Sequence, residues 1–459
     1  MEKNKSPSRK HRSRRQFLGA SVAAAATIVS PHILGLGGRK PPSETLNIVG
    51  AGAGGAMCKN DLSRFSILGQ NIVAVADCLT FDAWQDKSKL RYKEYYPKAT
   101  IYRDYRVMLE KEKNIDAVVV ATPDHSHAVI TMAALQLGKH CYTEKPLTRT
   151  VSEARAIAKA AREAGVVTQM GNNGHSGGWI RRICEYIWQG AIGPVREAHI
   201  WTDRPFWPCG IGRPGDRPKV PASLDWDLWL GPAPERPYHP SYLPNYWRGW
   251  VDFGCGAIGD MACHNMDGAF WALKLGHPSS IEASSTPITD QNRETYPKAS
   301  IITYRFPARG DMPECKVTWH DGGLLPPVPL GAKPNMKLPK NGSYFVGDRG
   351  VLMNDNNENQ DWNPFLLPTT LQEKHPRPKK ILPDSIGHFE EWVAAAKGED
   401  VDCYSNFDYA ARLTETALLG NVALRAGEKI YWDGPNMRVT NVPAANEFVH
   451  HQYRSGWSL

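Results

Sequence analysis

Short apolar runs alternate with longer mixed segments through the first third of the chain. Each run is continuous rather than interrupted by polar residues, which is typical of strands buried on both faces of a sheet. The order of elements predicts an α/β domain with a doubly wound parallel sheet over residues 44–171. The predicted strands lie at the start of 44–62 and within 71–78, 116–122, 139–147 and 166–176, and the predicted helices within 104–113, 123–138 and 148–165.

The pattern changes after this region. A helix is expected at 177–190, and an amphipathic helix within 407–434 is expected to end at Gly427 and precede a last strand. Between 203 and 252, ten prolines and five tryptophans lie in a stretch without periodicity, which predicts a functional loop. Residues 172–459 are therefore predicted to form an α+β domain. Runs of β-favouring residues, which suit a half-solvated sheet, occur at 195–203, 279–287, 299–306, 315–321 and 343–353.

The excess positive charge of the chain lies at its start. The formal net charge is +8, and residues 1–40 hold nine Lys and Arg against one acid. The remaining basic and acidic residues are equal in number, 46 of each, so no general attraction for nucleic acid is expected. The nine cysteines include no CxxC pair, which argues against a disulfide framework or a zinc ribbon.

Residues 13–29 combine a basic start with an alanine-rich apolar run. The run is shorter than the roughly 20 apolar residues that span a membrane, so no permanent membrane anchor is expected. The hexapeptide SRRQFL at 13–18 resembles a twin-arginine export signal. Residues 1–43 are predicted to be this signal and a linker. Because that route carries folded proteins, it predicts a periplasmic protein that receives its cofactor before export.

A glycine-rich turn follows the first predicted strand. Gly50, Gly52 and Gly55 have the spacing of a dinucleotide-binding turn, and Gly54 permits a second register. Such a turn lets the backbone approach a pyrophosphate at a helix N-terminus. Asp77 ends the second predicted strand, where an acid would bind the adenosine ribose, and no arginine follows it directly. These residues predict NAD rather than NADP.

Polar residues gather at the predicted carboxyl ends of later strands, where ligands bind in such sheets. The cofactor-binding residues predicted there are Thr122, Pro123, Asp124, His127, Glu144 and Lys145. Further along, the segment GDMACHNMD places Asp260, His264 and Asp267 at spacings of four and three, on one face of a helix. That spacing is compatible with a solvated face, a metal site or a proton relay.

The glycine turn, ATPDHSH, EKPL and GDMACH together resemble the glucose–fructose oxidoreductase and inositol dehydrogenase (Gfo/Idh/MocA) family, from about residue 44 to 456. The resemblance implies a Rossmann domain, a second domain with an open, mostly antiparallel sheet, and a dimer or tetramer formed through that sheet. It also implies oxidation of a sugar or cyclitol hydroxyl. It favours the proton relay over a metal site, with Lys145, Asp260 and His264 as the catalytic group.

Each of these residues has an expected role in that chemistry. His264 would take the hydroxyl proton, because an imidazole titrates near neutral pH. Asp260 would orient His264 or hold a neighbouring hydroxyl. Lys145 would stabilise alkoxide character on the reacting oxygen. Asp267 is expected to cap a helix or bind backbone. The expected substrate contacts are His175, at the end of the last strand segment predicted at 166–176, and Tyr246 and Trp250, aromatic residues before Asp260.

The combined expectation is an exported oxidoreductase that transfers a hydride between a sugar or glycoside hydroxyl carbon and NAD. The cofactor is expected to be tightly bound, because a dissociable one would be lost in the periplasm. One alternative is a redox-neutral, NAD-dependent glycosidase that works by oxidation, elimination, hydration and reduction. Others are a non-catalytic sugar- or NAD-binding protein and a metal-dependent hydrolase.

Overall fold

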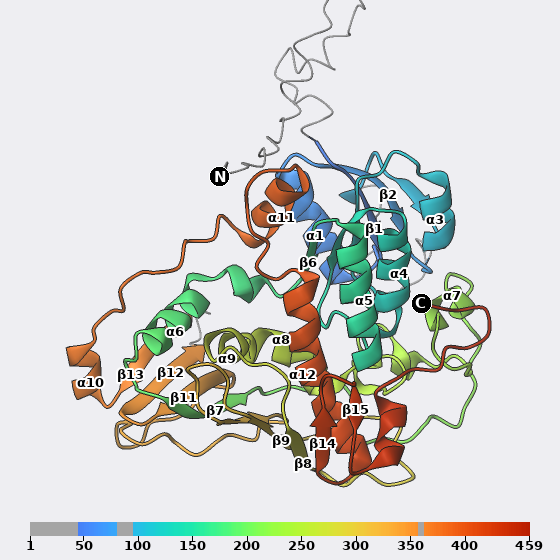
Figure 1. The fold of residues 1–459 in the computed structure, drawn as a ribbon. Coiled ribbons are helices and arrows are strands. Elements are labelled where there is room, and N and C mark those ends of the chain that lie inside the picture. The colour runs from blue at the N-terminus through green and yellow to red at the C-terminus, as the bar shows by residue number, and fades with distance from the viewer. Residues whose placement is uncertain (1–44, 80–94, 357–361) are drawn as a thin grey trace, which may run out of the picture. The chain divides into compact units, whose positions relative to one another are not determined.

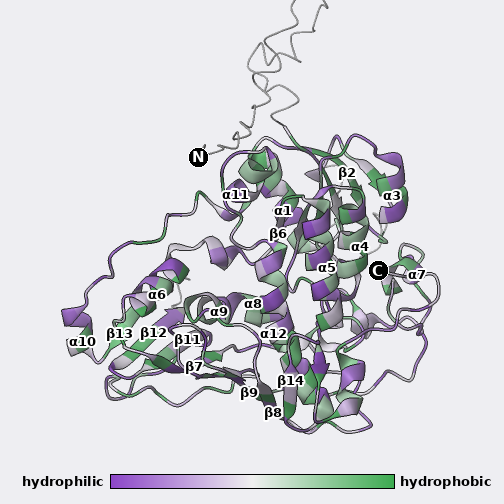
Figure 2. Ribbon diagram, in the orientation of Figure 1, coloured by the Kyte–Doolittle hydropathy of each residue, from purple (hydrophilic) through white to green (hydrophobic). Residues whose placement is uncertain are grey.

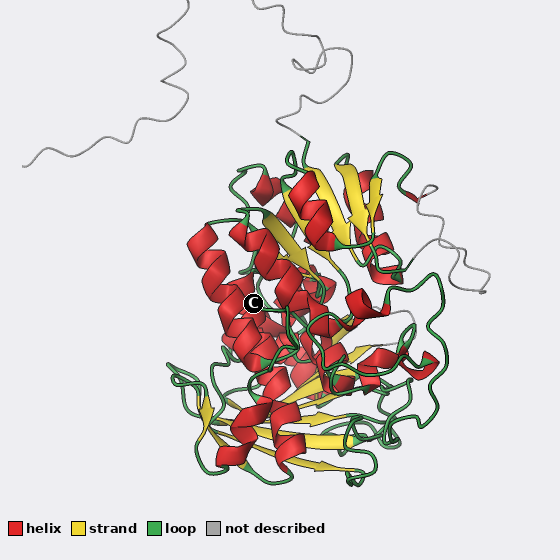
Figure 3. Ribbon diagram, turned by 90° about the vertical axis from the view of Figure 1, so that its right-hand side faces the viewer, coloured by secondary structure: helices red, strands yellow, loops and turns green. Residues whose placement is uncertain are grey.

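The computed structural model describes residues 45–79, 95–356 and 362–459. The predicted export signal at 1–43 lies outside these residues. Leu46–Leu459 form one unit by their contacts, and that unit contains two sheets. In Figure 3 the sheets appear as two separate groups of strands with helices packed against them. Within the described ranges, no helix combines the length and the apolar character needed to cross a membrane.

The first sheet has six parallel strands in the order β3-β2-β1-β4-β5-β6. This is the strand order of a Rossmann fold, so the predicted doubly wound parallel sheet is confirmed. The strands are β1 (Asn47–Ala51), β2 (Asn71–Ala76), β3 (Thr100–Tyr102), β4 (Ala117–Val120), β5 (His140–Thr143) and β6 (Thr168–Met170). All four residues of β4 are buried, because helices cover both faces of the sheet.

Two groups of helices cover this sheet. One face packs against α3 (Tyr105–Lys111), α4 (Asp124–Gln136) and α5 (Val151–Ala164), and Figure 1 shows α4 and α5 side by side. The other face packs against α1 (Ala56–Ile67) and α11 (His388–Ala396). Helix α11 comes from far along the chain, and the indole of Trp392 donates to the Cys141 carbonyl of β5 at 3.2 Å.

Local signals fix the ends of α5 as the sequence predicts. The Thr150 hydroxyl accepts from the Glu153 amide, and the Glu153 carboxylate accepts from the Thr150 amide. These paired bonds satisfy amides that have no partner inside the helix. Gly165 ends the helix with a φ of 63°, which a residue without Cβ adopts at little cost.

The second sheet has nine strands in the order β13-β12-β11-β7-β10-β9-β8-β14-β15. Every adjacent pair is antiparallel except β7 and β10, so the expected mostly antiparallel sheet is confirmed. The strands are β7 (Val195–Trp201), β8 (Ser280–Ser285), β9 (Ser300–Phe306), β10 (Cys315–His320), β11 (Gly342–Gly347), β12 (Gly350–Asn356), β13 (Trp362–Leu367), β14 (Ile430–Asp433) and β15 (Arg438–Val439). The run at 343–353 is two strands of a hairpin rather than one.

One face of this sheet packs against helices, and burial along β9 alternates accordingly. The helices are α6 (Gly178–Trp188), α8 (Gly256–Asn265), α9 (Asp267–Ala272) and α12 (Phe407–Ala426). Figure 2 shows both hydrophobic and hydrophilic residues along α6, as expected for a helix with one buried face. The remaining short helices are α7 (Trp226–Leu230), α10 (Thr369–Lys374), η3 (Asn173–Ser176), η4 (Pro240–Tyr242), η5 (Tyr246–Gly249) and η6 (Pro443–Phe448).

The proline- and tryptophan-rich stretch at 203–252 has a hydrophobic core of its own. Trp229, Trp247, Trp250 and Phe253 are buried there together with two tyrosines and several aliphatic residues. Much of its aromatic content therefore packs the stretch against itself. Its last part, η5, leads into α8, so the stretch also positions residues at the start of the candidate site.

Candidate active site

The turn after β1 brings backbone close to the neighbouring strand. Gly52 has a φ of 88°, and a Cβ there would lie 2.6 Å from the Ala121 carbonyl oxygen. A Cβ on Gly50 would lie 2.6 Å from the Leu62 side chain, so this glycine lets α1 pack closely on β1. Gly55 precedes α1 as its N-cap and is exposed. The turn thus presents an accessible helix N-terminus, which suits a pyrophosphate.

Asp77 lies beside this turn, at the end of β2. Its carboxylate accepts from the Gly54 amide at 2.6 Å and from the Leu79 amide at 2.8 Å. These bonds fix the carboxylate next to the glycine turn. From the sequence, Asp77 is expected to bind the adenosine ribose at this position. The geometry fits the proposed role of Asp77.

The turn between β4 and α4 carries four of the predicted residues, Thr122, Pro123, Asp124 and His127. The His127 ring lies 2.8 Å from each of two backbone carbonyl oxygens, those of Thr122 and Pro146. Burial lowers the pKa of His127 to about 4. Because its ring nitrogens face these carbonyls inside the protein, His127 is placed to join the β4–α4 turn to the loop after β5 rather than to bind a ligand directly.

Asp124 is the first residue of α4 and is buried. Burial raises its pKa to about 7, although the positive charges of Arg248 and Lys145 oppose the rise. Asp124 therefore lies within electrostatic reach of the residues after β5 and before α8. This places the predicted β4–α4 turn and the predicted catalytic group at one site.

Glu144 directly follows β5 and lies in the protein interior. Burial raises its pKa to about 7, against the effect of Lys145. A Cβ on Gly171 would lie 2.3 Å from its carboxylate, so only glycine fits there. Asp61 of α1 is a second buried carboxyl group nearby, and burial and Glu144 both raise the pKa of Asp61. Asp61 was not predicted from the sequence, because its neighbours Lys59, Asn60, Ser63 and Arg64 are polar and give no sign that it is buried.

Lys145 and Asp260 form an ion pair between the two parts of the fold. The Lys145 ammonium donates to the Asp260 carboxylate and to its backbone carbonyl, each at 2.9 Å. Burial lowers the pKa of Lys145, but Asp260 and Glu144 outweigh it and leave the pKa raised. Burial raises the pKa of Asp260, but Lys145 and Arg248 reverse this and hold it well below its usual range. Both groups are therefore charged at neutral pH.

Arg248 is a second cation on the same carboxylate. Its Nε donates to Asp260 Oδ1 at 3.2 Å, and its guanidinium lies 4.2 Å from the centre of the Trp247 ring. The sequence analysis missed Arg248, although it lies between two residues chosen as substrate contacts. A basic residue two positions after Tyr246 was the available signal.

His264 lies one helical turn after Asp260 in α8. Burial is the main cause that lowers its pKa to about 3, and the charges of Lys145 and Arg204 add to the effect while Asp260 opposes it. The imidazole is therefore neutral at physiological pH, and the expectation that it titrates near neutral pH is wrong because burial disfavours the charged ring. A neutral imidazole can accept a proton, which a general base requires. Among the described residues, no group of three or more His, Cys, Asp and Glu is arranged to hold a metal ion.

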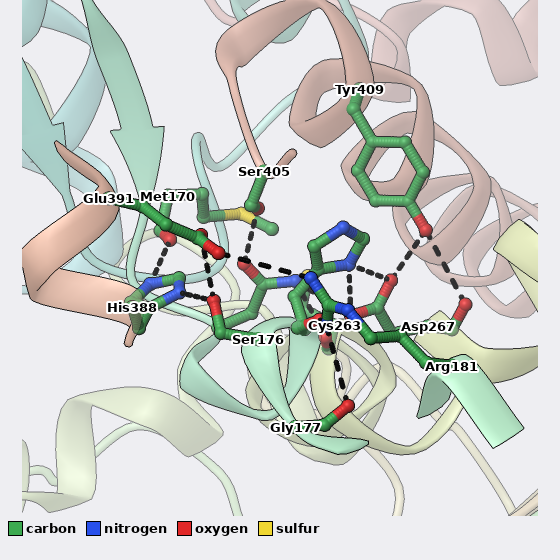
Figure 4. Close-up of polar contacts among 12 residues, drawn as sticks. Met170, Ser176, Gly177, Arg181, Cys263, Asp267, His388, Glu391, Ser405 and Tyr409 are labelled. Atoms are coloured by element: carbon green, nitrogen blue, oxygen red, sulfur yellow. Dashed lines mark hydrogen bonds and ion pairs between the residues drawn. The ribbon is translucent and has the colours of Figure 1, made fainter. Parts of the chain in front are cut away.

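His175 belongs to a buried network, and the expectation that it contacts substrate is wrong. It is 1% exposed, stacks on Trp271, and its Nδ1 lies 2.9 Å from the Asp267 carboxylate. Tyr409 of α12 donates to the same carboxylate at 2.5 Å. Figure 4 shows the Tyr409 hydroxyl directed at Asp267. Asp267 thus joins η3, α9 and α12. The His175–Asp267 pair therefore stabilises the fold.

Tyr246 and Trp250 have different environments. Tyr246 is 42% exposed at the start of η5, two residues before Arg248, so it remains a candidate contact. Trp250 has no exposed surface, and its indole donates to the Ser241 carbonyl at 3.0 Å. The expectation that Trp250 contacts substrate is therefore wrong, because its whole ring is covered by protein.

The fold and this group of residues define a Rossmann-type nucleotide-binding protein with a charged Lys–Asp pair and a neutral histidine. Residues 46–172 match the model of an oxidoreductase family with an NAD-binding Rossmann fold, and residues 207–310 match its C-terminal alpha/beta domain. Together the matches span 231 of 459 residues, just over half of the chain. The chain belongs to the Gfo/Idh/MocA family of oxidoreductases.

Two curated relatives each match only a segment of the chain. A segment of 160 residues is 32% identical to 1,5-anhydro-D-fructose reductase of Ensifer adhaerens and covers 34% of this chain and 37% of that protein. A segment of 92 residues is 36% identical to levoglucosan dehydrogenase of Pseudarthrobacter phenanthrenivorans and covers 20% of this chain and 23% of that protein. The matches therefore span well under half the length of these relatives.

A solved structure shares the fold over most of its length. The WlbA dehydrogenase of Bordetella pertussis, solved in complex with NADH and UDP-GlcNAcA, has a TM-score of 0.57 and 15% sequence identity. The alignment covers 84% of this chain and 99% of that chain. At this identity the likeness concerns the fold.

Proposed function

We propose that this protein is an exported oxidoreductase that transfers a hydride between a hydroxyl-bearing carbon of a sugar or glycoside and a tightly bound NAD. The observation that carries the proposal is the Lys145–Asp260 ion pair, with His264 one helical turn away in α8. It joins the carboxyl edge of the nucleotide-binding sheet to the second part of the fold. The names of the two relatives, both of which include a sugar derivative, support a carbohydrate substrate.

The Lys145–Asp260 pair and His264 have different roles at the substrate hydroxyl. The Lys145 ammonium donates a hydrogen bond to the reacting oxygen and stabilises the negative charge that grows on it. His264 accepts the hydroxyl proton in its neutral form. Asp260 keeps Lys145 charged and fixed in position, and Arg248 donates to the same carboxylate oxygen, Oδ1, and so helps to hold Asp260 in place.

The turn after β1 fits a dinucleotide. Gly52 cannot carry a Cβ, the exposed Gly55 begins α1, and Asp77 is fixed beside them. When bound, the nicotinamide accepts or returns the hydride. The Rossmann family match and the NADH in the WlbA structure support a nicotinamide cofactor. The choice of NAD follows from Asp77, because a carboxylate at the ribose position repels a 2′-phosphate.

Export and tight binding belong together in this proposal. The SRRQFL sequence supports the twin-arginine route to the periplasm. A protein that works there must retain its cofactor and reset it with a second substrate. We also propose that the chain assembles as a dimer or tetramer through the second sheet.

The test uses protein purified from the exported fraction with its own leader. Native mass spectrometry is expected to show one NAD per chain, and a carbohydrate screen is expected to raise the absorbance of reduced nicotinamide for at least one sugar. A p-nitrophenyl glycoside is included to test for glycosidase action. Release of nitrophenol without an added acceptor would replace the oxidoreductase by the glycosidase. A bound cofactor that no carbohydrate reduces would instead indicate a binding protein.

A further inference from the structure

A cavity of about 680 Å³ lies away from the residues assigned to hydride transfer. Its walls are the start of α5 at Arg149–Val151, one side of α12 at Leu418–Arg425, and the C-terminal segment Glu447–Ser455. The two helices that line the cavity, α5 and α12, are labelled in Figure 1. It contains none of the predicted nucleotide-binding or catalytic residues. A cavity of this size accommodates a small organic molecule.

Two guanidinium groups face this cavity without a carboxylate partner among the described residues. Arg149 donates through Nη1 to the Val251 carbonyl at 2.9 Å, but its Nε is buried and has no hydrogen-bond partner in the described parts of the chain. Arg425 lies 3.8 Å from the centre of the Phe448 ring, and within the same described ranges it forms no ion pair. Each arginine therefore retains donors for an anion.

Most other charged or titratable groups that the structure describes on the cavity wall are paired or neutral, and Glu447 is the exception. Arg454 is paired with Asp227, and Asp252 is paired with the buried Arg236. Burial lowers the pKa of His451 to about 3, so its ring is uncharged at neutral pH. Glu447 is the remaining carboxylate and is exposed. The two arginines outnumber this carboxylate, so the unpaired charge on the cavity wall is positive.

Asn421 of α12 contributes a buried hydrogen-bond acceptor that has no donor among the described residues. Its Nδ2 donates to the Cys255 carbonyl at 2.8 Å, which sets the orientation of the amide. Its Oδ1 is buried and has no partner among the residues that the structure describes, and the residue is only 6% exposed. A buried acceptor without a donor is costly, so a ligand hydroxyl here would be stabilising.

We propose that this cavity binds a small polyhydroxylated anion, whose carboxylate or phosphate contacts Arg149 and Arg425 and whose hydroxyl donates to Asn421. The site is separate from the active centre but is connected to it through the chain. Arg149 follows Lys145 by four residues. The carbonyl groups of Val251 and Cys255, which Arg149 and Asn421 hold, lie in the segment that leads into α8.

Isothermal titration calorimetry of the full chain with NAD tests the proposal. The probes are D-gluconate for a carboxylate, D-glucose 6-phosphate for a phosphate, and D-glucose as the uncharged control. At least one anion is expected to bind at one site per chain, and in Arg425→Gln its Kd is expected to rise at least tenfold. Arg425→Lys, which keeps the charge, is expected to retain part of the affinity.

Two variants separate this cavity from other sites. Arg412→Gln changes an exposed arginine on the same helix outside the cavity, and Lys145→Met changes the active centre. Both are expected to leave the Kd within twofold of the wild-type value. The proposal is overturned if neither anion binds, if Arg425→Gln binds like the wild type, or if binding is lost in Lys145→Met. Because calorimetry needs no turnover, these outcomes do not depend on the proposed reaction.

Discussion

The Lys145 ammonium lies 2.9 Å from the Asp260 carboxylate, although 115 residues separate them in the chain. The pair is nearly closed to solvent, with side chains 10% and 12% exposed. Removing one partner leaves a charge with poor solvation. The contact therefore fixes the second part of the fold against the edge of the nucleotide-binding sheet and supplies a charged donor there.

Lys145→Met is expected to lower kcat by about 10² to 10³-fold, the usual loss when one donor to a developing oxyanion is removed. Methionine keeps most of the volume but cannot donate a hydrogen bond. The rate of nicotinamide reduction measures the effect, and thermal melting checks the fold. Activity within threefold of the wild type would show that Lys145 does not contact the reacting oxygen.

His264→Gln is expected to lower kcat/KM by about 10² to 10⁴-fold, the usual contribution of a general base. Because the pKa of His264 is lowered to about 3, the imidazole is unprotonated at both pH 5.5 and pH 7.5. The ratio of wild-type to variant kcat/KM should therefore be equal at these two pH values. A ratio that falls about tenfold at pH 5.5 would mean that His264 titrates near its ordinary pKa.

Arg248→Gln is expected to reduce kcat/KM by about 10 to 100-fold, because a hydrogen bond to a charged group contributes about 1.5–3 kcal/mol. The substitution removes one of the two cations that hold Asp260. Arg213→Gln is the matched control, since Arg213 pairs with Glu294 at an exposed position of the same stretch. Equal kcat/KM values for the two variants would show that Arg248 has no role in the active site.

Asp61→Asn is expected to make stability less sensitive to alkaline pH. The folded pKa values of Asp61 and Glu144 are raised, so the folded state binds their protons more tightly than the unfolded state. Wild-type stability is therefore expected to fall as the pH rises from about 5 to 8. The substitution replaces the second buried carboxyl group with an amide. This amide can donate a hydrogen bond to ionised Glu144.

Urea unfolding of Asp61→Asn at pH 5.5 and pH 8 measures this effect. The variant is expected to gain about 1–3 kcal/mol over the wild type between these pH values, the cost of an unsatisfied buried group. Glu163→Gln, at an exposed position of α5, is the control and should show no gain. A variant that loses stability equally at both pH values would contradict the raised pKa of these two carboxyl groups.

Tyr246→Ala and Trp250→Ala separate the two aromatic candidates. Tyr246 is 42% exposed, so its removal is expected to raise KM and to change the free energy of unfolding by less than about 0.5 kcal/mol. Trp250 is fully buried, and its removal is expected to cost about 3–5 kcal/mol. Urea unfolding and steady-state kinetics give both values. A stable Trp250→Ala variant with a raised KM would reverse the assignment.

The sequence predicted the elements whose signals are local. The continuous apolar runs indicated the parallel sheet, and the helix predicted within 148–165 is α5, whose ends Thr150, Glu153 and Gly165 fix. The spacing of Asp260 and His264 placed them one turn apart on a helix. Each of these depends on residues close together in the chain, where periodicity and capping rules apply.

Features that depend on distant contacts were missed. Arg248 gains its role only because α8 turns Asp260 towards it, and Asp61 only because α1 packs beside Glu144. His175 follows a strand, as substrate-binding residues do, yet Asp267 and Trp271 enclose it. A residue type and its place in the chain do not say which of its faces the rest of the fold will cover.

The most direct test of the central claim follows the hydride itself. Protein loaded with NAD is mixed with a sugar substrate that carries deuterium on the oxidised carbon, and the cofactor is analysed by mass spectrometry after one turnover. The account predicts one deuterium in the reduced nicotinamide ring for the wild type and none in Lys145→Met over the same time. Consumption of the sugar without deuterium in the cofactor would contradict it.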